Sequence, residues 1–274
     1  MLSKKRETAG EIVIDKLTVG SCEVWLRGST PLIYNSMSRK TKSDLLYPKG
    51  RKTAADKAQT LKHDPITEFR SSVYRRIEEG DTRLTFPASA VKSAMCNAAL
   101  EIPGAKKAQI GRLVWTIGDA VSMFGIPKLL MSVVRSADMN KTPDIRTRAI
   151  LPEWCCGVRI NFVLPTMNET AIARLLGTAG LVIGLGDYRQ EKGKGNYGQF
   201  EVVTYEECKD IIALGGAEEQ DAALESPEPY DVESQELLEW YLDERVKRGW
   251  HAEGGAIEAN AEKSVPRKRA KKVA

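Results

Sequence analysis

The residues with the clearest chemical potential lie in one glycine-rich segment, residues 184–203. Five glycines fall within fifteen of its residues, and glycine lets backbone N–H groups approach a phosphate closely and take up positive φ. Basic side chains beside the glycines add charge, and tyrosines add flat rings on which unpaired bases can stack. The segment is therefore typical of a surface that binds single-stranded nucleic acid. The residues concerned are Tyr188, Arg189, Lys192, Gly193, Lys194, Gly195, Tyr197 and Gly198.

This segment is not one of the standard nucleotide-binding loops. A dinucleotide fingerprint that began at Gly184 would need a further glycine at position 189, where the chain has arginine. The pair Gly193 and Gly195 has neither the spacing nor the Ser/Thr of a Walker loop. The alternative hypothesis is a plain flexible loop, because glycine-rich segments also occur without a ligand.

A second basic segment mixes arginines with aspartates. Asp138 and Asp144 could be metal ligands, and a metal-dependent nuclease that uses them together with Asp187 is a competing hypothesis. The sequence places no third carboxylate next to the pair, so we expect no metal site. The arginines of the segment are expected to contact phosphates, and they are Arg135, Arg146 and Arg148.

Other candidates for catalysis are few. The two histidines, His63 and His251, are far apart in sequence, which argues against His-based metal sites and a nucleophile–histidine pair. Five cysteines form no CxxC pattern, which fits thiols used as small apolar side chains in a reducing cytoplasm. We therefore expect no enzymatic activity and no cofactor.

Charge is divided unevenly along the chain. The formal net charge is only +4, but residues 206–244 contain fourteen Asp/Glu and one Lys, and residues 245–274 contain nine Lys/Arg and three Glu. Residues 1–205 consequently hold 31 Lys/Arg against 20 Asp/Glu. A basic body is typical of a protein with a polyanionic partner, and an ordinary solvated surface is the alternative.

No apolar run is long enough to span a bilayer, and the charged first residues lead into no apolar signal segment. We therefore expect a cytoplasmic protein with no membrane partner.

Periodicity predicts the elements that position these residues. Short apolar or alternating runs predict strands at residues 12–17, 22–26, 83–86, 112–117, 121–124, 129–134, 156–164 and 200–204. Apolar residues at helical spacing predict helices that begin near Pro65, at residues 89–100, at 166–176 and at 234–248. Ser89 is expected to cap the second helix, and Asn168 or Thr166 the third.

Strands and helices are mixed rather than strictly alternating, which predicts an α+β fold with an antiparallel sheet. A ferredoxin-like, RRM-like βαββαβ arrangement fits the two strongest helices. Residues 35–80, with eleven Lys/Arg against six Asp/Glu, form a basic insertion, and residues 138–148 form an extended loop or hairpin tip. Residues 206–248 form an acidic extension with one helix, and residues 249–274 form a disordered basic tail.

Three segments resemble the RAMP superfamily, whose members build class 1 CRISPR effector complexes. They are the glycine loop, Phe86-Pro-Ala-Ser-Ala-Val-Lys92, and the passage from Leu26 to Pro31-Leu-Ile. The resemblance covers residues 22–203 and is to the guide-RNA-binding backbone subunits. It implies a ferredoxin-like palm in residues 1–205, with residues 35–80 as fingers and 135–148 as a thumb. It places near the RNA backbone Ser89, Lys92, Gly193, Lys194, Gly195 and Gly198.

Family members that cut RNA use an aspartate after the first strand, where this chain has Asn35, so the resemblance implies binding without cutting. Two binding hypotheses follow. The chain polymerises as a homo-oligomer along CRISPR guide RNA beside other effector proteins, or it is a phage protein that coats single-stranded DNA for annealing and recombination beside recombination proteins.

Overall fold

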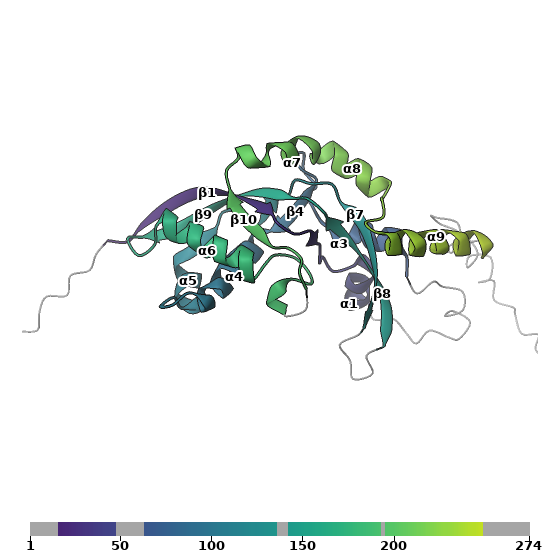
Figure 1. Ribbon diagram of the computed structural model, residues 1–274, viewed down its shortest axis with the longest axis horizontal. Helices are drawn as coiled ribbons and strands as arrows, with labels where there is room; N and C mark the ends of the chain where they lie inside the picture. Colours follow the sequence, from purple (N-terminus) through teal and green to yellow (C-terminus); the bar gives the residue numbers. More distant parts are fainter. Residues whose placement is uncertain (1–15, 48–62, 136–141, 193–194, 249–274) are drawn as a thin grey trace, which may run out of the picture. The chain divides into compact units, whose positions relative to one another are not determined.

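A computed structural model describes residues 16–47, 63–135, 142–192 and 195–248 of the chain (Figure 1). In these residues it shows α-helices, short 3-10 helices and antiparallel strands, which confirms the predicted α+β class. The chain divides into two compact units, each assembled from separate stretches of sequence. The first comprises residues 16–36, Val73–Pro127 and Leu151–Glu225, and the second comprises Met37–Ser72, Lys128–Ile150 and the residues from Ser226 onward.

The first unit is built on a four-stranded antiparallel sheet. Its strands are β1 (Thr18–Gly28), β5 (Val114–Thr116), β9 (Cys155–Leu164) and β10 (Phe200–Val203), in the spatial order β10-β1-β9-β5. β1 and β9 pair from Thr18 opposite Leu164 to Arg27 opposite Cys155. Alternate residues of β9 are buried, as its sequence pattern predicted: Val158, Ile160 and Phe162.

Two helices, α4 (Ala88–Ala98) and α6 (Glu169–Val182), pack together against this sheet (Figure 1). The Asn168 side chain caps α6 by accepting a hydrogen bond from the backbone N–H of Ala171 at 2.8 Å. The prediction that Ser89 caps α4 is wrong. The N-cap residue is Pro87, because β4 (Leu84–Pro87) runs directly into the helix and leaves Ser89 in its first turn.

A smaller antiparallel sheet in the same unit has the order β3-β4-β6, with β3 at Tyr74–Arg75 and β6 at Ala120–Ser122. One buried side chain, Gln220 of α8 (Ala217–Glu225), joins the helix to this sheet. The unit also contains β2 (Leu32–Ile33), the helices α5 (Lys107–Leu113) and α7 (Lys209–Leu214), and the 3-10 helices η1 (Ala99–Glu101), η2 (Gln190–Lys192) and η3 (Glu206–Cys208).

The second unit contains the antiparallel pair β7 (Lys128–Arg135) and β8 (Pro143–Leu151) with the helices α1 (Arg39–Leu46), α3 (Pro65–Ser72) and α9 (Val232–Lys247). Two serine hydroxyls connect helices to strands. Ser72 accepts from the backbone N–H of Ala149 at 2.8 Å, and Ser234 accepts from that of Met131 at 2.9 Å.

Three expectations differ from the structure. The acidic extension holds η3, α7, α8 and α9 rather than one helix. Its apolar residues have partners far away in sequence: α9 packs against β7, and Cys208 and Ile211 pack with Phe124 and Cys155. Residues 143–148 belong to strand β8 rather than to a loop, because β7 supplies backbone partners for them. Helix α5 was not predicted. The expected disordered tail, residues 249–274, lies outside the described residues.

Candidate nucleic-acid interface

The glycine loop is held by backbone hydrogen bonds to the segment that follows β1. The N–H of Asp187 donates to the carbonyl of Ile33, and that of Gly198 donates to the carbonyl of Pro31, both at 2.8 Å. Within the loop, the N–H of Leu185 donates to the carbonyl of Gly198 at 2.8 Å. These bonds place both ends of the loop in a fixed position in the first unit.

The glycines of the loop serve its own backbone packing. A Cβ at Gly195 would overlap the carbonyl oxygen of Tyr188, and one at Gly198 would overlap that of Leu185. Gly198 also has φ +72°, a conformation that favours glycine. At these two positions, the space in which a phosphate was predicted to lie is filled by the protein's own carbonyl groups. Gly193 and Lys194 lie outside the described residues.

Two tyrosines of the loop lie side by side. The ring centroids of Tyr188 and Tyr197 are 6.2 Å apart, with an angle of 47° between the planes. Tyr188 has φ +51°, which is uncommon for a bulky residue, and its side chain is 54% exposed. The packed carbonyl of Tyr188 and the hydrogen bond from its N–H to Asp187 Oδ1 at 3.0 Å hold this backbone in place. The structure therefore presents a ring to solvent from a fixed backbone.

The guanidinium of Arg189 is engaged within the protein. Its Nε and Nη2 donate to Glu191 Oε2 at 2.9 and 2.6 Å, and its Nη1 donates to the carbonyl of Gly186 at 3.0 Å. The Asn97 amide of α4 donates to the other oxygen of Glu191. Arg189 thus ties the loop to α4, which makes it a positioning residue rather than an open phosphate contact. Neither Asn97 nor Glu191 was predicted from the sequence as part of the site. The available signal was the carboxylate two residues after Arg189.

Two residues of α4 were predicted to contact nucleic acid, and neither is fully buried. Ser89 is exposed, and Lys92 is half-buried. Burial raises the pKa of the Cys96 thiol, and the charges of Lys92 and Lys107 oppose that rise, so both lysines lie near this thiol. At 3.6 residues per turn, Lys92 is about 140° around the helix from Asn97. The structure therefore does not place Lys92 on the face that contacts the loop, whereas exposed Lys192 belongs to the loop itself.

The three arginines of the β7–β8 pair do not share one face. Directly opposed residues of an antiparallel pair lie on the same face. Arg146 faces Ser132 and Arg148 faces Leu130, two positions apart on β8, so these two arginines are on one side. Arg135 is opposite Pro143, which places it on the other side. All three belong to the second compact unit, whereas the glycine loop belongs to the first.

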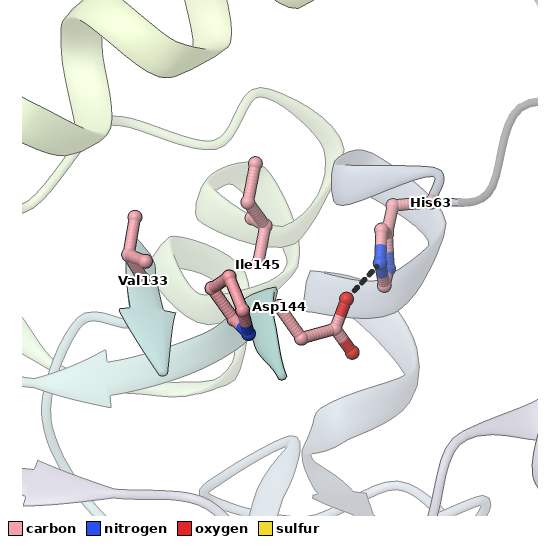
Figure 2. Close-up of a pocket in the computed structure, with 5 residues that line it drawn as sticks. His63, Val133, Asp144 and Ile145 are labelled. Atoms are coloured by element: carbon pink, nitrogen blue, oxygen red, sulfur yellow. Dashed lines mark hydrogen bonds and ion pairs between the residues drawn. The ribbon is translucent and has the colours of Figure 1, made fainter. Parts of the chain in front are cut away.

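A small pocket of the second unit is lined by His63, Val133, Pro143, Asp144 and Ile145 (Figure 2). The Nε2 atom of His63 lies 2.9 Å from Asp144 Oδ1, and its Nδ1 atom lies 2.9 Å from an oxygen of Glu68. Both bonds are satisfied only when both ring nitrogens carry a proton, because a carboxylate accepts. The histidine therefore connects the start of α3 to β8.

The same part of the second unit contains a buried phenol. Tyr241 of α9 donates to Asp64 Oδ1 at 3.3 Å, and burial together with that carboxylate raises the pKa of Tyr241 to about 12. Asp64 also accepts from the Thr67 hydroxyl at 2.8 Å. These contacts fix the start of α3 against α9, which is a structural role.

Of the three aspartates of the nuclease hypothesis, the structure describes two, and they belong to different units: Asp144 to the second and Asp187 to the first. Asp144 contacts His63, Asp187 accepts from the N–H of Tyr188, and Asp138 lies outside the described residues. Across the described ranges, no group of three or more His, Cys, Asp or Glu side chains is placed to hold a metal ion.

Asn35, which stands where the sequence resemblance implies an aspartate in proteins that cut RNA, has an engaged side chain. The Oδ1 atom of Asn35 accepts a hydrogen bond from the Tyr74 hydroxyl at 3.0 Å. Tyr74 in turn packs edge-on against Phe86, with ring centroids 5.8 Å apart. Asn35 therefore has a structural role beside the rings of Tyr74 and Phe86.

No family model matches the chain, and no curated protein matches its sequence. In the part of the chain that the structure describes, no helix has the length and apolar character needed to cross a bilayer.

Proposed function

We propose that this protein binds single-stranded nucleic acid through the loop of residues 184–198 and does not cut it. The observation that carries the proposal is the exposed Tyr188 ring on a fixed backbone beside Tyr197. A base can stack on such a ring only when it is unpaired, and stacking does not depend on sequence. A ring whose backbone is already ordered loses little conformational entropy on binding.

In the described part of the loop, exposed Lys192 supplies positive charge for a phosphate, whereas Arg189 is held by Glu191. Lys194 and Gly193 remain predicted contacts. Ser89 and Lys92 of α4 remain predicted contacts as well. Lys/Arg contacts to phosphates make binding salt-dependent, which is a property of the proposal that can be measured.

The strand order of the first unit supports the RAMP-like palm that the sequence resemblance implies. The elements β1-α4-β5-β9-α6-β10 follow a βαββαβ pattern, and the sheet order β10-β1-β9-β5, with α4 and α6 packed against the sheet, supports the proposal of a ferredoxin-like palm. On this proposal residues 35–80 act as fingers and residues 135–148 as a thumb, and the protein forms a filament of copies along one strand.

The test compares two variants of one side chain. Tyr188→Phe keeps the ring, whereas Tyr188→Ala keeps the Cβ and therefore adds no new backbone strain. Fluorescence anisotropy with a labelled single strand should show that the alanine variant loses about 1–3 kcal/mol of binding free energy, since one base–aromatic stack typically contributes that amount. The phenylalanine variant should bind within about two-fold of the unchanged protein.

Equal binding by all three proteins would refute the proposal. Matched RNA and DNA strands of one sequence separate its two forms: tighter binding of RNA favours the guide scaffold, and tighter binding of DNA favours the phage annealing protein. A duplex competitor is the control for unpaired bases, because its bases are not available for stacking.

A further inference from the structure

Helix α9 has an outward row that no other part of the described chain covers. Its buried residues, Ser234, Leu238 and Tyr241, face the second unit's own core. Glu233, Glu236, Trp240 and Asp243 follow one another at spacings of three, four and three residues, so they form a single row along the helix. All are exposed, and the Trp240 side chain is 60% exposed.

The charges of this row are available for a partner. In the described ranges, Glu233, Glu236 and Asp243 make no ion pair, whereas Glu244 of the same helix binds both Lys247 and Arg248. An exposed indole attracts a cation to its face, and carboxylates one turn before and after it strengthen the local negative potential. The row is therefore suited to a basic peptide rather than to a polyanion.

One basic peptide is already attached to the helix. Residues 263–272 contain six Lys/Arg and no Asp/Glu, and they follow α9 in the same chain. Twenty residues separate Lys247 from Arg267, which is a reach of up to about 65 Å. The row from Glu233 to Asp243 is only about 15 Å long. A tethered segment within such reach has an effective concentration of the order of millimolar.

We propose that residues 263–272 dock on the outward row of α9 in the same chain. The carboxylates of Glu233, Glu236 and Asp243 pair with its bases, and one cation lies over the face of Trp240. The contact accounts for the opposite charges of the acidic extension and the basic tail, because each neutralises the other. It does not depend on nucleic-acid binding by the glycine loop.

The test is carbodiimide cross-linking of the full chain, which joins a lysine to a carboxylate only where the two are in contact. Mass spectrometry should find Lys268, Lys271 or Lys272 joined to Glu236 or Asp243 at low salt. These links should fall steeply near 0.5 M salt, where the Debye length is below about 5 Å. Trp240→Ala should lower their yield by about three- to five-fold through loss of the cation–π contact.

A matched pair of triple variants tests the position of the contact. Neutralising the row with Glu233→Gln, Glu236→Gln and Asp243→Asn should abolish the preferred cross-links between residues 263–272 and α9. Links that spread without preference over other acids, or survive this change, would overturn the proposal. The control removes the same charge from the first unit and should leave the α9 links intact, and its variants are Glu78→Gln, Glu218→Gln and Glu219→Gln.

Mixing isotopically labelled and unlabelled protein identifies the chain that supplies the segment. Links within one isotopic form support docking in the same chain. A statistical mixture of labelled–unlabelled links would show that a second copy supplies the segment, which contradicts the proposal as stated.

Discussion

Gln220 of α8 is the residue whose substitution should disturb the first unit most clearly. It is fully buried and every polar atom of its amide is engaged. Its Oε1 accepts from the backbone N–H groups of Arg83 and Leu84, both at 2.8 Å. Its Nε2 lies 2.7, 3.1 and 2.9 Å from the carbonyl oxygens of Met123, Gly125 and Gly215. One amide therefore joins three segments of chain.

Gln220→Leu keeps the volume but removes the acceptor from two buried N–H groups. An unsatisfied buried donor costs about 1–3 kcal/mol, so the variant should lose about 2–6 kcal/mol of unfolding free energy. Gln220→Glu keeps an acceptor but turns an ionised oxygen towards three carbonyls. The new carboxyl should therefore remain protonated in the folded state, with a raised pKa. Its variant should lose stability as pH rises through that value, because the unfolded chain ionises at lower pH.

Urea unfolding followed by circular dichroism at about pH 5 and pH 8 measures both effects, within the error of linear extrapolation. Gln235→Leu is the matched control, since Gln235 is exposed on α9 and its side-chain amide donates to Glu239 of the same helix. Its change should stay within about 0.5 kcal/mol. A loss below about 1 kcal/mol for Gln220→Leu would refute the assignment of Gln220 as the connecting residue.

Three further outcomes are expected. Gly195→Ala should lower the unfolding free energy by about 1–3 kcal/mol, because the new Cβ meets the protein's own backbone. Gly177→Ala should stabilise α6, because its Cβ meets nothing within 4 Å, and thermal unfolding compares the two variants. Lys192→Ala should reduce the log–log salt slope for a single strand by about 0.7, and Lys209→Ala, which removes a lysine paired with an acid, should leave it unchanged. Burial raises the pKa of Cys156 from 9.0 to about 12, so unfolding free energy should fall as pH rises above about 9, and Cys156→Ala should reduce that fall.

Local pattern was sufficient for the elements with strong periodicity. The alternation around Ile160 predicted β9, and Asn168 was one of the two caps predicted for α6. Local pattern did not predict the elements whose structure depends on partners far away in sequence. Strand β8 depends on pairing with β7. Helix α8 is held by Gln220, whose partners other than Gly215 are 95 to 137 positions away along the chain. No window of sequence contains such partners.

The loop shows why a site is harder to predict than a fold. A glycine at position 195 is equally compatible with a phosphate or with a neighbouring carbonyl, and only the path of the chain shows that Tyr188 occupies the space. Arg189 had the residue type of a phosphate contact, but Glu191 and Asn97 decide its role. Tyr188 has a positive φ and is exposed, and sequence reveals neither property.

The central claim is that an unpaired base contacts the tyrosines of the loop. Ultraviolet cross-linking of the full chain to a single strand that carries 4-thiouracil, followed by mass spectrometry of the peptides, tests it most directly. The account predicts adducts on Tyr188 or Tyr197, lost in Tyr188→Ala and unaffected by a duplex competitor. Adducts confined to other parts of the chain, with none in residues 184–198, would contradict it.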